Sequence, residues 1–336
     1  MRVGLDVGST TIKCVVLDDR NNLIYHTYER HYSHIVEKSA ELLRRVAEKC
    51  GREAVFAISG SAGMGMAESV KAPFVQEVFA TRVAANRLAP GTDVIIELGG
   101  EDAKILFLTN GLEVRMNGSC AGGTGAFIDQ MATLLKMGAD EMDQAAQTAE
   151  KTYTIASRCG VFAKSDIQPL INQGAKPADI AKSIYQAVVN QTISGLAQGR
   201  PIKGHVLYLG GPLTFSKCLR QSFDETLGVT GTCPENSLLF VALGAAFYAE
   251  ESWDLLKTAE LLEQRGMSET YRSQPPLFEN QAEYDAFKAR HAKAAVPQAD
   301  FPTDYAKPVH IGIDSGSTTV KVAVIDENAE LLFTDY

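Results

Sequence analysis

Hydrophobic and polar positions divide the first 250 residues of the chain into two halves with a similar order of elements. In the first half, turn-bounded apolar runs predict strands, and an amphipathic stretch predicts one helix: strands 2–7, 12–18, 22–28 and 53–59, helix 35–50. The second half predicts strands at 93–97, 103–109, 112–116 and 205–209, and helices near 122–136, 139–149, 160–173, 177–199, 214–227 and 237–250. This order predicts two α/β lobes that face a cleft.

An internal repeat extends this pattern to the end of the chain. Residues 4–18 recur as residues 312–326, with nine of fifteen positions identical at an offset of 308. We therefore expect residues 309–336 to be the first hairpin of a second, truncated domain, and the chain to be the front part of a longer protein. The proline-containing stretch 251–308 is expected to be a linker with one helix, with a helical arm docked on the first domain as the alternative.

Composition excludes several classes of protein. Apolar residues make up 45% and charged residues 22% of the 336 residues, as in ordinary folded proteins. The longest apolar stretch, 238–249, is too short to span a bilayer, which needs about 20 residues, and the N-terminus lacks a signal-peptide pattern. The net charge of −9 is spread over interspersed charges and disfavours a nucleic-acid binder. We expect a cytoplasmic protein with no membrane or nucleic-acid partner.

The first segment with chemical potential, residues 6–13, joins two predicted strands. Gly8 allows the backbone to approach a ligand closely, and Asp6 can hold magnesium through a water molecule. Phosphate oxygens can be bound by the backbone and by the side chains of Ser9, Thr10, Thr11 and Lys13. The alternative is an ordinary Gly-Ser hairpin turn, which the recurrence of the motif at 312–321 disfavours.

A second glycine turn, residues 97–104, also follows a strand and opens a hairpin. Two such turns from two lobes could clamp a triphosphate with magnesium between them. The carboxylates that could position magnesium or water are Glu97, Glu101 and Asp102, and the candidate phosphate ligands are Gly99, Gly100 and Lys104. A third turn, Gly210 and Gly211, follows a strand and suits contact with an adenosine moiety.

Two cysteines stand at the expected starts of helices. Cys120 lies in the small-residue segment 117–127, together with Gly123 as a further candidate ATP contact, and Cys159 lies in the segment 156–163. Helix N-termini favour the thiolate, so both could be metal ligands or reactive thiols. Two thiolates are half of an iron–sulfur site, and a two-fold interface could supply the other pair. Inert buried cysteines are the alternative, and a disulfide is disfavoured.

Three clustered histidines, His26, His31 and His34, have no acidic partner at a spacing suited to metal binding. This favours a surface or loop role.

Over residues 2–250 the chain resembles the ATP-dependent activases of 2-hydroxyacyl-CoA dehydratases and benzoyl-CoA reductases, the BadF/BadG/BcrA/BcrD ATPase family. The segments that carry the resemblance are 6–13, 97–104, 117–127 and 157–163. The tandem start of a second copy resembles the long fused activases, so that this chain would be an N-terminal fragment of one. Relative to the small activases, the chain has Glu97 in place of the usual Asp and Glu101 in place of the usual Gln.

The resemblance implies the two-lobed, ribonuclease-H-like and actin-like ATPase fold that sugar kinases and heat-shock chaperones share. Residues 1–250 would form the ATPase domain. Its parts would be lobe I over 1–92 plus 236–250 and lobe II over 93–235, followed by the linker 251–308 and the hairpin 309–336.

The resemblance also implies a function, with ATP or ADP, Mg²⁺ and a 4Fe-4S cluster as cofactors. Cys120 and Cys159 would ligate the cluster, with the other two thiolates from a homodimer partner or from the second repeat as an intrachain pseudo-dimer. In the family, ATP hydrolysis changes the angle between helices that point at the cluster and drives one low-potential electron into a partner enzyme. That partner would be a CoA-ester dehydratase or reductase, and the donor would be reduced ferredoxin or flavodoxin.

Two rival functions use the same phosphate loops. A sugar kinase or other small-molecule kinase would need an acceptor site and a catalytic carboxylate, and its cysteines would be incidental. A non-catalytic, actin-like scaffold would bind nucleotide and assemble without hydrolysing it.

Overall fold

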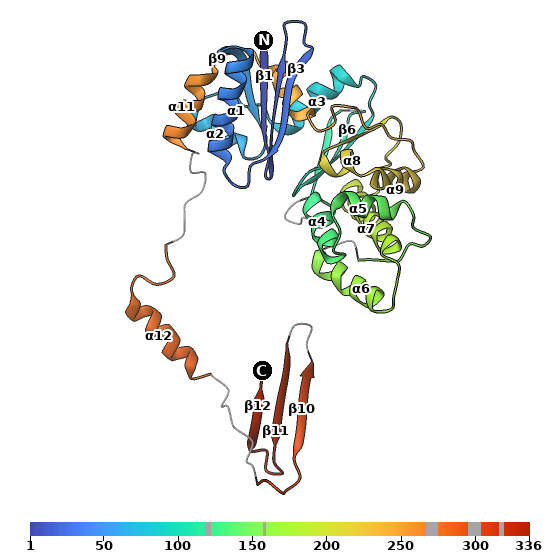
Figure 1. Cartoon of the computed structure of the whole chain (residues 1–336), viewed down its shortest axis with the longest axis vertical. Helices are drawn as coiled ribbons and strands as arrows, with labels where there is room; N and C mark the ends of the chain where they lie inside the picture. The colour runs from blue at the N-terminus through green and yellow to red at the C-terminus, as the bar shows by residue number, and fades with distance from the viewer. Residues whose placement is uncertain (110, 118–121, 157–158, 267–274, 295–303, 316–318) are drawn as a thin grey trace. The chain divides into compact units, whose positions relative to one another are not determined.

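The computed structural model describes residues 1–109, 111–117, 122–156, 159–266, 275–294, 304–315 and 319–336 (Figure 1). The chain divides into two units, Met1–Thr270 and Tyr271–Tyr336. Each unit is described below by itself.

The first sheet of the larger unit is built around the N-terminal hairpin. Its five strands lie in the order β3-β2-β1-β4-β9, with bounds Leu23–Arg30, Thr11–Leu17, Arg2–Val7, Glu53–Ser59 and Ser252–Asp254. β1 pairs antiparallel with β2 and parallel with β4, so that Asp6 stands opposite both Lys13 and Ser59. The central strands are buried on both faces, because helices cover both faces of the sheet. The covering helices include α1 (Ile35–Cys50), α2 (Gly63–Val70) and α11 (Leu255–Arg265).

The second sheet repeats the start of the first. Its order is β7-β6-β5-β8, with bounds Glu113–Met116, Ala103–Phe107, Val94–Leu98 and Val206–Leu209. β5 pairs antiparallel with β6 and parallel with β8, as β1 does with β2 and β4. Its helices are α4 (Gly125–Leu134), α5 (Ala139–Ala146), α6 (Gly160–Asn172), α7 (Pro177–Thr192), α8 (Gly211–Phe215) and α9 (Lys217–Leu227), and a π-helical turn, Ile193–Ala197, follows α7.

Two helices join the sheets through a shared core. These helices are α3 (Glu77–Leu88) and α10 (Phe240–Tyr248), whose apolar side chains pack with residues of both sheets. They cross at Gly244, where an added Cβ would overlap the carbonyl oxygen of Ala80. α10 also crosses β1 at Gly4, where an added Cβ would overlap the carbonyl oxygen of Ala242. The close packing of α10 against α3 and against β1 therefore requires glycine at both crossings.

The linker expected from residue 251 begins later in the structure. β9 pairs with β4, and α11 packs against α1 although the two helices are far apart in the sequence (Figure 1). Leu255, Ala259 and Leu262 of α11 are fully buried. β9 and α11 thus continue the first unit beyond residue 250, where the sequence predicted a linker.

The smaller unit contains α12 (Gln281–Ala292) and an antiparallel sheet in the order β10-β11-β12, with strand bounds His310–Ser315, Val320–Ile325 and Leu331–Asp335. The expected hairpin is therefore present with a third strand. Asp314 pairs with Lys321 as Asp6 pairs with Lys13, and both pairs have Nζ–Oδ2 distances of 2.8 Å. The sequence repeat is thus also a repeat of strand register.

Candidate functional site

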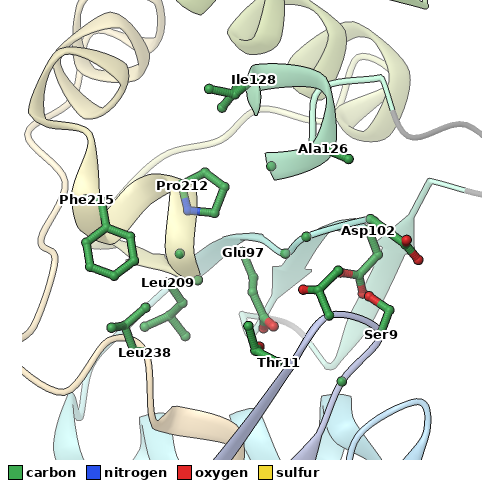
Figure 2. Close-up of a pocket in the computed structure, with 18 of the residues that line it drawn as sticks. Ser9, Thr11, Glu97, Asp102, Ala126, Ile128, Leu209, Pro212, Phe215 and Leu238 are labelled. Atoms are coloured by element: carbon green, nitrogen blue, oxygen red, sulfur yellow. The ribbon is translucent and has the colours of Figure 1, made fainter. Parts of the chain in front are cut away.

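A cavity of about 740 Å³ lies where the two sheets of the first unit end in glycine turns. Its volume suits a cofactor-sized molecule. The cavity brings together most of the residues that the sequence nominated: Asp6, Gly8, Ser9, Thr10, Thr11, Lys13, Glu97, Gly99, Gly100, Glu101, Asp102, Gly210 and Gly211. Figure 2 shows Ser9 and Thr11 of the first turn beside Glu97 and Asp102 of the second turn.

On the first turn, a lysine and an aspartate form a close ion pair. Lys13 Nζ lies 2.8 Å from Asp6 Oδ2, and both residues line the cavity. Burial alone would lower the pKa of the Lys13 ammonium, but the adjacent Asp6 carboxylate raises it above its usual value. Lys13 therefore stays charged beside the cavity and can attract an anionic group.

On the second turn, one buried lysine is surrounded by three carboxylates. Lys104 Nζ lies 2.7 Å from Asp102, 2.8 Å from Glu77 and 3.5 Å from Glu97. Burial would lower the pKa of Lys104, but these carboxylates raise it well above its usual range. Lys104 is 1% exposed and does not line the cavity. Its position favours a role in fixing these carboxylates rather than the expected direct contact with a phosphate.

The sequence analysis missed Glu77, the first residue of α3, which lines the same cavity. Burial, with smaller effects from Glu97 and Asp6, raises the pKa of its carboxyl group to about 7 despite the nearby Lys104 ammonium. The local sequence contains no phosphate-loop motif at Glu77. Only the packing of α3 between the sheets brings this carboxyl group to the site.

The two turns approach each other closely across the cavity. A Cβ added at Gly100 would lie 2.5 Å from Thr10 Oγ1. Behind the second turn, the first N–H groups of α4 donate to it, from Gly125 to the Gly99 oxygen at 2.9 Å and from Ala126 to the Gly100 oxygen at 2.8 Å. A change in the position of the second turn therefore acts directly on the start of α4.

The far side of the cavity is more apolar. Gly210 has φ of 87°, a conformation that glycine adopts without strain, and its neighbour Gly211 begins α8. The rings of Tyr28 and Phe215 meet edge to face with centroids 6.1 Å apart, and both residues line the cavity. This side offers backbone and aromatic surface to a flat ring system.

Comparison with known proteins identifies this architecture. The model of the BadF/BadG/BcrA/BcrD ATPase family matches residues 3–249. The chain belongs to this ATPase family. The (R)-2-hydroxyglutaryl-CoA dehydratase activating ATPase of Acidaminococcus fermentans is 29% identical over 252 residues, which cover 74% of this chain and 96% of that protein. The 2-hydroxyisocaproyl-CoA dehydratase activator of Clostridioides difficile is 30% identical over 254 residues, covering 74% of this chain and 94% of that protein.

A solved structure shows the same fold. Component A of the A. fermentans (R)-2-hydroxyglutaryl-CoA dehydratase superposes with a TM-score of 0.68 at 27% identity, covering 77% of this chain and 98% of that chain. The predicted two-lobed, actin-like ATPase fold and the predicted family membership are confirmed. The chain is thus an ATPase, and the cavity between its glycine turns is its candidate ATP site.

The carboxylates of this ATPase fit a magnesium ion held through water. Oδ1 of Asp6 is buried and has no hydrogen-bond partner within the described part of the chain. Glu97 Oε2 lies 3.4 Å from the Thr81 hydroxyl, which helps to fix this side chain. Among the residues that the structure describes, no group of three or more acidic, histidine or cysteine side chains is placed to hold a metal. Asp6 and Glu97 are therefore suited to contact through water rather than to a complete protein cage.

One candidate ligand, Cys159, and one candidate ATP contact, Gly123, do not line the cavity. Cys159 is half-buried and is the N-cap residue of α6, whereas Cys120 lies outside the described residues. Gly123 does not line the cavity, and an added Cβ there would lie 3.3 Å from the Gln191 side chain. Gly123 has φ of 81° and shapes the chain before α4.

None of the helices in the described parts of the chain is long and apolar enough to cross a membrane.

Proposed function

We propose that this ATPase is an activase that couples ATP hydrolysis to low-potential one-electron transfer, through a 4Fe-4S cluster, to a CoA-ester dehydratase or reductase. The observation that carries the proposal is the direct bonding between the second phosphate turn and the first N–H groups of α4. In the sequence, the segment with Cys120 comes directly before α4, so a movement of the start of α4 would act on the segment that carries this candidate cluster ligand. The names of the relatives, which are activators of CoA-ester dehydratases, support the nature of the partner.

The hydrolytic site needs a cation because its side chains are mainly acidic. The cavity is lined by Asp6, Glu77, Glu97, Glu101 and Asp102. A triphosphate would be repelled by these carboxylates, and Mg²⁺ held through water by Asp6 and Glu97 would offset this repulsion when bound. The turn N–H groups and Lys13 would bind phosphate oxygens. Glu77, Glu101 or Asp102 would orient the attacking water.

The cluster site requires a second pair of thiolates. Cys120 and Cys159 would supply two, and a homodimer partner or the second repeat of a longer chain would supply the others. Val161 and Phe162, directly after Cys159, are 71% and 62% exposed, and such apolar exposure is typical of a protein contact surface. Reduced ferredoxin or flavodoxin would donate the electron.

Anaerobic reconstitution with iron and sulfide tests the cluster. We expect wild-type protein to bind about two iron and two sulfide ions per chain, with the absorbance and reduced-state EPR signal of a 4Fe-4S cluster, if four thiolates from two chains hold one cluster. C120S and C159S should each lose this cluster. C50S is the matched control, since Cys50 lies at the end of α1 on the first sheet, and it should keep the cluster.

Retention of the cluster in C159S, or an iron-free wild type after reconstitution, would overturn this part of the proposal. ATP hydrolysis measured on the same samples tests the ATPase activity separately from the cluster. A kinase or scaffold would keep its nucleotide binding in both cysteine variants, and neither the wild type nor the variants would hold a cluster.

A further inference from the structure

His31 lies directly behind the first phosphate turn and contacts it with its side chain. The residue lies in the loop after β3, but it is only 3% exposed and is therefore not a surface residue. Its Nε2 lies 3.0 Å from the Gly8 carbonyl oxygen, and its Nδ1 accepts a hydrogen bond of 3.2 Å from the Ser33 N–H. Because Nδ1 is the acceptor, Nε2 carries the hydrogen and donates it to Gly8.

The main chain of His31 holds the same turn at a second point. Its N–H donates to the Thr10 carbonyl oxygen at 3.3 Å, while the Gly8 N–H donates to the Thr11 carbonyl oxygen at 3.0 Å. Gly8, Thr10 and Thr11 line the cavity, and His31 does not. The Gly8 and Thr10 carbonyls are therefore engaged by a residue outside the cavity. A carbonyl oxygen turned toward a phosphate would repel it, so this arrangement favours anion binding by the turn.

The backbone after His31 is in an unusual conformation. Tyr32 and Ser33 have φ of 47° and 65°, and neither is glycine. Each such residue costs free energy and persists only where its surroundings hold it in place, and such residues cluster at functional sites. The hydrogen bond from the Ser33 N–H to the imidazole is one of the contacts that fix them here.

We propose that His31 is a positioning residue for the first phosphate turn, which it holds with the Gly8 and Thr10 carbonyls directed away from the bound polyphosphate. This inference rests on the proposed role of the cavity as the nucleotide site and deepens it. His31 acts through Gly8 and Thr10 and does not itself touch the nucleotide.

The test compares two ligands that differ in their phosphates. The affinities of ADPNP, with Mg²⁺, and of adenosine are measured by calorimetry for wild type, H31A and H31Q. We expect H31A to bind ADPNP about tenfold more weakly, the size of effect that loss of one buried hydrogen bond can have, with adenosine affinity changed less than about twofold. H31Q should recover part of the ADPNP affinity, because its amide can donate to Gly8. H34A is the matched control, since His34 is exposed and makes no side-chain cap to α1.

A loss that is equal for ADPNP and adenosine would indicate general destabilisation and overturn the positioning role. Wild-type affinity for both ligands in H31A would also overturn it. If H31A does not fold, H31Q is compared with wild type instead, and thermal unfolding is measured for both variants. An H31Q protein that folds but loses affinity for ADPNP and adenosine equally contradicts the inference. Failure of the wild-type chain to bind ADPNP would instead remove the nucleotide site on which the inference rests.

Discussion

At the scale of single residues, the site contains four carboxylates that form ion pairs with only two lysines, Lys13 and Lys104, among the described residues. Lys104 holds Glu77, Glu97 and Asp102 within 3.5 Å, and Lys13 holds Asp6. These contacts fix the directions of the acidic groups before any cation or nucleotide binds. Burial raises the pKa of the Glu77 carboxyl group to about 7.

The raised pKa of Glu77 predicts a pH-dependent stability in the absence of nucleotide. Between pH 4.5 and 7 the folded state keeps a proton on Glu77 that the unfolded state has released, so the free energy of unfolding falls as pH rises through this window. The expected loss is on the order of 1–2 kcal/mol. E77Q should abolish it, as measured by urea unfolding at pH 5 and pH 7.

E101Q is the control for this experiment, because Glu101 lines the same cavity but is exposed. It should retain the wild-type difference between the two pH values. An E77Q protein with the same pH dependence as wild type would contradict the assignment of this dependence to Glu77.

At the scale of elements, the repeat supplies its own comparison. Gly4 of β1 and Gly312 of β10 occupy the same position of the repeated motif, yet only Gly4 faces a helix. An added Cβ at Gly4 would overlap the backbone of α10, whereas at Gly312 the nearest atom is the Ala323 carbonyl oxygen, 4.0 Å away. The same sequence is therefore under different packing constraints in the two units.

G4A should lower the free energy of unfolding of the first unit by about 1–3 kcal/mol, because β1 and α10 must separate to admit the methyl group. G312A should leave this unit unchanged. Thermal unfolding followed by circular dichroism measures both variants. Equal melting temperatures for G4A and wild type would contradict the close crossing of β1 and α10.

The second phosphate turn provides an element-scale prediction for activity. A Cβ at Gly100 would lie 2.5 Å from Thr10 Oγ1, so G100A should push the two turns apart. We expect at least about a tenfold fall in the rate of ATP hydrolysis, which corresponds to a loss of about 1.4 kcal/mol of transition-state stabilisation. G91A provides the comparison at a glycine with no atom within 4 Å of an added Cβ, although its φ of 85° adds some backbone strain. Unchanged hydrolysis in G100A would contradict the close approach of the turns.

The sequence predicted the elements whose patterns are local and missed those set by packing. The hairpin strands were found because they are apolar runs bounded by turns, and α1 was found because its apolar residues lie on one side. The sequence did not predict α2 and α3. α2 contains two glycines, which are unfavourable in helices, and α3 packs between the sheets and has no single apolar side to reveal it. β9 has three residues, too few for any pattern. Glu77 reaches the site only through the packing of α3, and no local motif could have indicated it.

At the scale of the whole molecule, two units follow one another along the chain. The first ends after α11, whose residues Leu255 and Leu262 are fully buried, and the division falls after residue 270. The sheet of the smaller unit, β10-β11-β12, repeats the strand register of the first hairpin, but Ile311 and Ile313 are 64% and 67% exposed where Val3 and Leu5 are buried. Within the described residues, the second copy therefore has the strand pairing of the first, but these two apolar side chains stay exposed.

Truncation separates the contributions of these parts. A chain of residues 1–270 should unfold at the same temperature as the first unit of the full chain and bind ADPNP with the same affinity. A chain of residues 1–250 lacks β9 and α11 and should be less stable by several kcal/mol, at about 1.5–3 kcal/mol for each large apolar side chain lost from the core. Differential scanning calorimetry compares the three proteins. Equal stability of the two truncated chains would place the domain end at residue 250 after all.

We propose that nucleotide bound at the glycine turns alters the cluster through the start of α4. The EPR spectrum of the reduced, reconstituted protein with ADP and with ADPNP tests this coupling. We predict different spectra, and a different rate of iron release to a chelator, for the two nucleotides. The difference should be lost in G100A. Identical spectra and release rates at saturating ADP and ADPNP, in a protein shown to bind both, would rule out this coupling.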